Sequence, residues 1–150
     1  MKKGVLLSLV FLLLAGLAAA AFSFSKEGNE EPKGATVAAR STLAMKPWIW
    51  VSTTYSDGKV IKAKTAKFKL TLSKDGRFSS TTDCNTLGGQ YSTEDQKITV
   101  SQIVSTQMYC ENSQEKDYIK ALSQVGSYFF RTSGELVFDL QYDSGSSIFR

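Results

Sequence analysis

In the stretch Ala66-Lys67-Phe68-Lys69-Leu70-Thr71-Leu72-Ser73-Lys74-Asp75-Gly76-Arg77-Phe78, apolar and polar residues alternate up to a sharp turn. Three apolar side chains would lie on one face of an extended segment and lysine and threonine on the other, as in a half-buried β-strand. The Asp75-Gly76 pair favours a tight hairpin, because glycine accepts positive φ without steric cost. The stretch therefore predicts a strand over 66–72, a turn and a second strand over 77–82.

Similar strand patterns recur on both sides of this hairpin at short intervals. We expect further strands at residues 48–54, 89–93, 97–101, 126–131, 135–140 and 147–150. Turn-forming sequences separate several of them, namely Glu94-Asp95-Gln96, Ser133-Gly134 and Asp143-Ser144-Gly145. The chain is therefore predicted to be mainly β.

One segment breaks the alternation. Between residues 112 and 124, the apolar residues Tyr118, Ile119 and Leu122 recur at helical spacing. Asn112 with Glu115 three positions on predicts a helix N-terminus, and Gly126 predicts its end. The whole pattern predicts an α+β domain, which is a small antiparallel β-barrel or strongly curved sheet of about eight strands. The helix at about 112–124 would cover an opening or an edge.

The N-terminus has the pattern of an export sequence. Lys2 and Lys3 precede an almost unbroken apolar run that extends to residue 24. Residues 1–24 are thus either a cleaved signal peptide or an uncleaved membrane anchor, and both alternatives place the rest of the chain in the periplasm or outside the cell. We expect residues 25–45 to form a flexible linker and residues 46–150 to form one folded domain.

The charge distribution argues against nucleic-acid binding. The formal net charge is +4, of which Lys2 and Lys3 supply two, and the remaining lysines are scattered. A nucleic-acid footprint needs a concentrated basic face. We expect a monomer that contacts membrane only through the N-terminal segment, if that segment is retained.

Cys84 and Cys110 are 26 positions apart, and they could form either a redox pair or a structural disulfide. Thioredoxin-type chemistry uses a Cys-X-X-Cys spacing, which this chain lacks. An oxidising compartment favours the bond, and closing a loop of about 27 residues would stabilise the fold by ~3.5 kcal/mol in the chain-entropy model. We therefore expect a structural disulfide.

The sequence contains few residues that could support catalysis or bind a metal ion. A structural zinc site at Asp83, Cys84, Asn85 and Cys110 would contain two sulfurs and no imidazole, because the chain has no histidine. The many serines and threonines likewise have no histidine to act as a base. We expect no cofactor and no enzymatic reaction. Asn85 is predicted to shape a loop by bonding nearby backbone, and Gly88 and Gly89 to bend the chain.

Aromatic residues could form either the core or a contact surface. Most of them occupy alternating strand positions, which favours the core. In Tyr128-Phe129-Phe130, however, adjacent residues face opposite ways, so at least one ring should be exposed unless the helix covers it. This motivates the hypothesis of an apolar ligand or partner. The residues concerned are Trp48, Trp50, Tyr91, Tyr128, Phe129, Phe130 and Phe138.

Several of these residues occur in an order that resembles a known family. The matching positions are Trp48, Lys74-Asp75-Gly76-Arg77-Phe78, Asp83-Cys84-Asn85, Gly89, Tyr91, Ile98, Thr106, Met108, Cys110, Glu115, Tyr118 and Leu122. In these positions the chain resembles the META domain family, which includes the HslJ-type heat-shock proteins of bacterial envelopes. Asp83 stands where many members have glycine, and Tyr109 where a small residue is often found.

The resemblance implies a compact, largely β domain with one helix, an envelope or secreted location, and a link to stress tolerance without an established reaction. We therefore expect a non-enzymatic, exported binding or scaffolding module linked to stress or drug tolerance. Its partner would be an envelope protein or an apolar ligand. The alternatives are a carrier of a small hydrophobic ligand or lipid and a hydrolytic enzyme that uses carboxylates.

Overall fold

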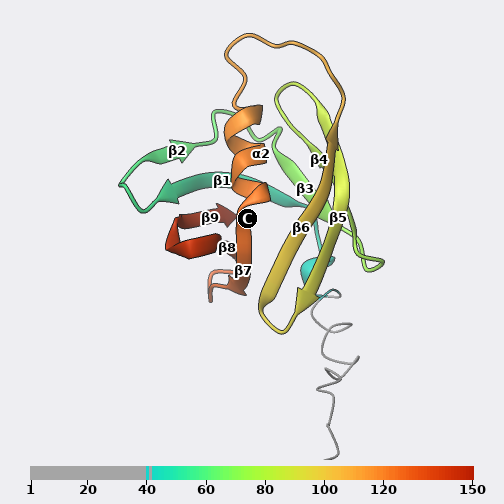
Figure 1. Ribbon diagram of the computed structural model, residues 1–150, viewed down its shortest axis with the longest axis vertical. Helices are drawn as coiled ribbons and strands as arrows, with labels where there is room; N and C mark the ends of the chain where they lie inside the picture. Colours follow the sequence, from blue (N-terminus) through green and yellow to red (C-terminus); the bar gives the residue numbers. More distant parts are fainter. Residues whose placement is uncertain (1–39, 41) are drawn as a thin grey trace, which may run out of the picture.

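A computed structural model of the chain describes residue 40 and residues 42–150 (Figure 1). The predicted signal peptide or anchor at 1–24 and most of the predicted linker lie outside these residues. The described strands are β1 (Trp48–Tyr55), β2 (Val60–Lys62), β3 (Lys69–Leu72), β4 (Arg77–Thr81), β5 (Thr86–Glu94), β6 (Lys97–Ser105), β7 (Val125–Phe130), β8 (Leu136–Leu140) and β9 (Gly145–Phe149). Helix α2 (Glu115–Ser123) connects β6 to β7, and the 3-10 turn η1 (Gln141–Asp143) connects β8 to β9.

The strands form a closed antiparallel barrel. Neighbours pair in the order β1-β3-β4-β5-β6-β7-β8-β9, and β9 returns to pair with β1. Eight strands thus close the barrel, while β2 pairs with the far half of β1, beyond the short β1–β3 ladder. The prediction of a mainly β domain with a small antiparallel barrel and one helix is confirmed. Closure leaves the barrel strands with neighbours on both sides.

The strand boundaries differ from the predicted ones where the chain turns. The strand predicted over 66–72 begins only at Lys69, because residues 64–67 form a bend and a turn, in which the Lys67 N–H donates to Thr65 Oγ1. Strands β5 and β6 are longer than predicted, since their antiparallel ladder runs from Glu94↔Lys97 to Leu87↔Ser105. β2 was not predicted, because a three-residue strand carries almost no alternation signal.

The helix starts later than the sequence suggests. α2 begins at Glu115, and Asn112 lies outside it in the left-handed region at φ 60°. Asn112 and Glu115 are therefore not a capping pair. The helix ends at Ser123, followed by Gln124, so Gly126 does not close it but lies in β7. Acidic residues do occupy the first turn, where they suit the helix dipole.

Helix α2 packs its apolar face into the barrel. In Figure 1, α2 stands between β6 on one side and β1 and β2 on the other. Tyr118 and Leu122 of α2 are fully buried, and the Tyr118 ring lies 5.3 Å from the ring of Trp50 and 5.2 Å from that of Phe68. The Phe149 ring lies 5.2 Å from that of Phe138 and 6.4 Å from that of Tyr118. Large side chains thus fill the barrel interior.

Ordered structure extends N-terminal to residue 46, where we expected the folded domain to begin. Leu43 is fully buried in the core, and its carbonyl accepts a hydrogen bond of 2.8 Å from Trp48 Nε1. The C-terminal end of the predicted linker is therefore part of the domain. Within the described residues, no helix has the length and apolar character needed to span a bilayer.

Most of the aromatic residues are core residues, as their alternation predicts. Trp48, Trp50, Tyr91, Tyr128 and Phe138 are buried. The two rings that follow Tyr128 are not: Phe129 and Phe130 remain 41% and 36% exposed. The prediction that at least one aromatic of this run faces solvent is confirmed.

Candidate functional site

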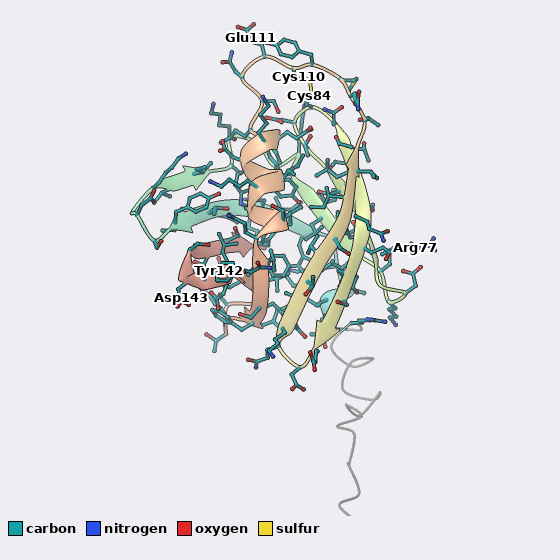
Figure 2. The ribbon with its side chains drawn as sticks, in the orientation of Figure 1. Arg77, Cys84, Cys110, Glu111, Tyr142 and Asp143 are labelled. Carbon is teal, nitrogen blue, oxygen red and sulfur yellow. A yellow bond between two sulfur atoms is a disulfide. The ribbon has the colours of Figure 1, made fainter. Side chains whose placement is uncertain are left out.

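The two cysteine-bearing segments meet at one end of the barrel. Cys84 lies in the β4–β5 loop and Cys110 in the connection from β6 to α2, and a disulfide joins them with 5.7 Å between their Cα atoms. Figure 2 shows this bond at the top of the molecule, beside Glu111. We call the surrounding residues the clasp, which comprises Thr82, Asp83, Cys84, Asn85, Thr106, Met108, Cys110 and Glu115.

The side-chain amide of Asn85 is at the centre of the clasp. Its Oδ1 accepts hydrogen bonds from Thr106 Oγ1 at 2.8 Å and from the Met108 N–H at 2.9 Å. Its Nδ2 donates to the Met108 carbonyl at 3.1 Å and to Glu115 Oε1 at 3.0 Å. Asn85 was predicted to bond nearby backbone; instead its side chain bridges to residues that are 21 to 30 positions away.

The Glu115 carboxylate accepts hydrogen bonds at both oxygens. Oε2 accepts from Thr82 Oγ1 at 2.5 Å and from the Asn85 N–H at 2.9 Å. Oε1 accepts from Asn85 Nδ2, and from Ser105 Oγ at 3.4 Å. Hydrogen bonds to an ionised acceptor are among the stronger ones in proteins. Glu115 therefore contributes to folding, with its oxygens directed at the protein itself.

Asp83 bonds to Ser113 and Gln114, which directly precede α2, whereas the N-cap residue Gln114 makes no side-chain capping bond. Its Oδ2 accepts from the Gln114 N–H at 2.8 Å, and its Oδ1 accepts from Ser113 Oγ at 2.5 Å. The Gln114 side chain in turn donates to the Lys62 carbonyl and accepts from the Lys64 N–H. Asp83, one of the two positions at which this chain departs from the family pattern, thus connects the β4–β5 loop to the start of α2.

The disulfide expected between Cys84 and Cys110 is present, and the described residues contain no free cysteine. Its loop encloses β5, β6 and most of the clasp. Among all the residues that the structure describes, no group of three or more His, Cys, Asp or Glu residues is arranged to hold a metal ion.

Other family-motif residues lie away from the clasp, among them Trp48, Gly89 and Tyr91. Trp48 is a core residue of β1. Tyr91 donates from its hydroxyl to the Ser73 carbonyl at 2.7 Å and so anchors the β3–β4 turn. Gly89 lies within β5, where an added Cβ would be 2.4 Å from the ring of Phe78.

Gly88 and Gly89, which we expected to bend the chain, lie within strand β5 and not in a turn. The β5–β6 register shifts between Gly88 and Gln90. At Gly89 the missing side chain allows close approach of neighbouring groups, which is a common reason for glycine in a strand.

Apolar side chains are exposed next to the clasp. Met108 is 62% exposed and Tyr109 is 91% exposed, and Val104 at the end of β6 is also solvent-facing. Met108 and Tyr109 line an open depression of about 270 Å³ with the disulfide, Asn112 and Lys116. We call residues 106–112 the clasp loop. This exposure could not be predicted from the sequence, in which the only related feature is Tyr109 where the family often has a small residue.

The fold and the site together define a class of protein. It is a small closed β-barrel with one helix packed into it, in which the residues of the clasp join two loops. A family model described as the META domain matches residues 41–147. The chain belongs to the META domain family, which confirms the resemblance.

Two solved structures are similar in fold. One is described as an NMR structure of a protein from Burkholderia xenovorans, with a TM-score of 0.62 and 22% identity; 75% of this chain and 86% of that chain are covered. The other is a crystal structure of a DUF4847 family protein from Bacteroides vulgatus, with a TM-score of 0.57 and 15% identity; 74% of this chain and 95% of that chain are covered. No curated protein gives a significant match.

Proposed function

We propose that this protein is an exported, non-catalytic META-domain module that binds another protein of the bacterial envelope through its clasp loop. Its role would be one of contact or scaffolding in stress or drug tolerance. The observation that carries the proposal is the contrast within the clasp. The polar groups of its central residues bond to one another, while Met108 and Tyr109 in the same loop face solvent.

The hydrogen bonding supports a non-catalytic role. A general base or nucleophile needs a polar atom that can reach a substrate. The oxygens of Glu115 and Asp83 accept from protein donors instead, and both sulfurs of the clasp are in the disulfide. The clasp therefore has the features of a structural element.

The exposed side chains support a binding role. Methionine and aromatic residues are enriched at protein interfaces, where they contribute contact area. Met108 is held by two backbone hydrogen bonds to Asn85, and Cys110 is held by the disulfide, so Tyr109 between them is presented on an ordered loop. Such preorganisation lowers the entropic cost of binding.

Export is supported by two separate features. The N-terminal apolar run behind Lys2 and Lys3 has the composition of an export sequence. The Cys84–Cys110 disulfide is of a kind that persists in oxidising compartments.

The alternative of a carrier for a small hydrophobic ligand has less support. A carrier barrel encloses a cavity for its ligand. Here Trp50, Phe68, Tyr118, Phe138 and Phe149 occupy the interior with almost no exposure. A ligand would therefore have to displace core side chains.

The proposal is tested by capture from envelope extracts with the oxidised protein as bait. A Met108→Ser/Tyr109→Ser double variant removes the exposed apolar groups and keeps the backbone bonds. The matched control is Tyr142→Ser, which removes a tyrosine that is 96% exposed at another part of the surface.

Mass spectrometry should identify proteins that the natural sequence and the control enrich and the double variant does not. Thermal unfolding should verify that all three baits are folded. Equal capture by all three, or no enrichment over empty resin, would contradict the proposal.

A further inference from the structure

A second surface feature lies away from the clasp. It is an open groove of about 750 Å³ formed by the end of β1, the start of β7 and the β8–η1–β9 connection. Figure 2 shows two of its residues, Tyr142 and Asp143, at the side of the molecule, well separated from Cys84 and Cys110.

The groove is rich in hydroxyl and carboxylate groups and contains no lysine or arginine. Its side chains include four small hydroxyl groups, two aspartates and two tyrosines, which come from Thr54, Tyr55, Ser56, Ser127, Asp139, Tyr142, Asp143 and Ser146. Lys120 Nζ lies 5.1 Å from the centroid of the Tyr55 ring, but the lining itself holds two carboxylates, which would repel a phosphate, nucleic acid or anionic lipid headgroup. The groove therefore favours ligands that donate hydrogen bonds and carry no negative charge.

The two aspartates are available to a ligand. Among the described residues, the side chains of Asp139 and Asp143 have no hydrogen-bond or ion-pair partner, whereas the Glu115 carboxylate accepts from several donors. Asp139 is half-buried in the groove. A half-buried carboxylate without a partner gains most from a ligand that donates to it, because hydrogen bonds to charged groups are the stronger ones.

Tyr142 is displayed by a backbone conformation that its residue type disfavours. Tyr142 and Asp143 both lie in the left-handed region, at φ 58° and 52°, and the Tyr142 side chain is 96% exposed. Non-glycine residues in this region carry strain and concentrate at ligand-binding sites. The exposed ring adds nothing to the core, so packing does not explain its presence here.

The connection that carries Tyr142 is firmly attached on both sides. The Gln141 N–H donates to the Gln124 carbonyl at 2.7 Å, and the Ser56 N–H donates to the Ser144 carbonyl at 3.0 Å. Gly145 lies so close to β1 that an added Cβ would be 2.2 Å from the Thr54 carbonyl oxygen. The surrounding structure thus holds the backbone of Tyr142 at the rim of the groove.

We propose that this groove is a saccharide-binding site. The Tyr142 ring provides an apolar platform for the C–H face of a sugar ring, and Asp139 and Asp143 accept hydrogen bonds from its hydroxyl groups. The serine and threonine hydroxyls of the lining, which both donate and accept, complement a polyhydroxylated ligand. The ligand class is a neutral oligosaccharide, since the lining carries two carboxylates and no lysine or arginine.

The test is an NMR titration of the ¹⁵N-labelled oxidised protein with four tetrasaccharides. Three are neutral, built from β-1,4-linked N-acetylglucosamine, glucose or mannose, and the fourth is an anionic heparin fragment. Spermidine serves as a cation that is not a sugar. At least one neutral tetrasaccharide should cause saturable shifts of the Ser56, Ser127 and Gly145 amides, and neither heparin nor spermidine should do so.

Two variants localise the binding. Tyr142→Ala should weaken binding by roughly tenfold or more, which corresponds to about 1.4 kcal/mol. Tyr109→Ala, which removes an equally exposed ring from the clasp loop, should leave the affinity unchanged. The proposal is overturned if no neutral tetrasaccharide gives saturable shifts, if spermidine shifts the same amides, or if Tyr142→Ala binds as well as the natural sequence. None of these results bears on protein capture by the clasp loop.

Discussion

Asn85 and Met108 are joined by a pair of hydrogen bonds across 23 positions of the chain. The Asn85 amide accepts from the Met108 N–H and donates to the Met108 carbonyl, as a neighbouring strand would. A side chain thus takes the place of a backbone partner for Met108. Because the loop carries Tyr109 and Cys110 directly after Met108, its conformation depends on this pair.

Glu115→Gln should destabilise the protein by about 2 kcal/mol, because one carboxylate oxygen becomes an NH₂ group that faces the donors of the clasp. With the NH₂ group at the Oε1 position, Asn85 Nδ2 loses its acceptor on residue 115. With the NH₂ group at the Oε2 position, Thr82 Oγ1 and the Asn85 N–H lose their acceptor on residue 115 and keep only the bonds between Thr82 and Asn85. Denaturant unfolding monitored by tryptophan fluorescence would measure the loss.

The matched control for this variant is Glu111→Gln, which makes the same chemical change on an exposed residue of the same connection. Its free energy of unfolding should stay within about 0.5 kcal/mol of the natural protein. Equal effects of the two substitutions would show that the hydrogen bonds of Glu115 do not hold the clasp together.

Gly89→Ala should destabilise the barrel by about 3 kcal/mol, whereas Gly88→Ala should be nearly neutral. A Cβ at Gly89 would lie 2.4 Å from Phe78 Cε1 and 2.8 Å from the Ser101 carbonyl oxygen, but at Gly88 its nearest neighbours are 3.8 Å away. The difference in thermal midpoint between the two variants measures the effect. Similar midpoints would mean that Phe78 does not pack on the β5 backbone.

Tyr118 should make the stability of the protein decrease in alkaline solution. Burial raises the pKa of Tyr118 well above its usual value near 10, although the hydrogen bond with Ser80 partly opposes this. Below about pH 10 the phenol is neutral in both folded and unfolded chains, so its contribution is fully present. Above that pH the unfolded chain loses the proton first, and the free energy of unfolding falls by ~1.4 kcal/mol per pH unit.

The Tyr118→Phe variant separates this effect from other alkaline titrations. At neutral pH it should cost about 1 kcal/mol, because the Ser80 hydroxyl loses its 2.8 Å partner. Between pH 10 and 12 its stability should fall less steeply than that of the natural protein, and Tyr142→Phe should not change the slope. Parallel curves for the natural protein and Tyr118→Phe would rule out the buried phenol as the cause.

The barrel could be predicted from the sequence because its signals are local. Alternation around Leu70, the Asp75-Gly76 turn and the helical spacing of Tyr118 and Leu122 each lie within a few residues. The short strand β2 and the later start of α2 could not be predicted in this way. β2 is too short to show a period, and α2 begins where Asp83, some 30 positions away, accepts from the Gln114 N–H.

The candidate sites were less predictable for the same reason. The family motif identified Asn85, Met108 and Glu115 as a group, but their hydrogen bonds join segments that only the folded barrel brings together. The groove around Tyr142 carries no sequence signal at all. A tyrosine at positive φ cannot be inferred from its type, since glycine and asparagine are the residues that normally indicate such a conformation.

Hydrogen exchange at the Met108 amide tests most directly whether the clasp orders its loop. In the natural protein this amide should exchange slowly, because it donates to Asn85 Oδ1 at 2.9 Å. In Asn85→Ala it should exchange rapidly, while the Tyr91 amide, which donates to the Gly76 carbonyl, stays protected. Rapid exchange of Met108 in the natural protein, at the rate of an unstructured chain, would contradict the account.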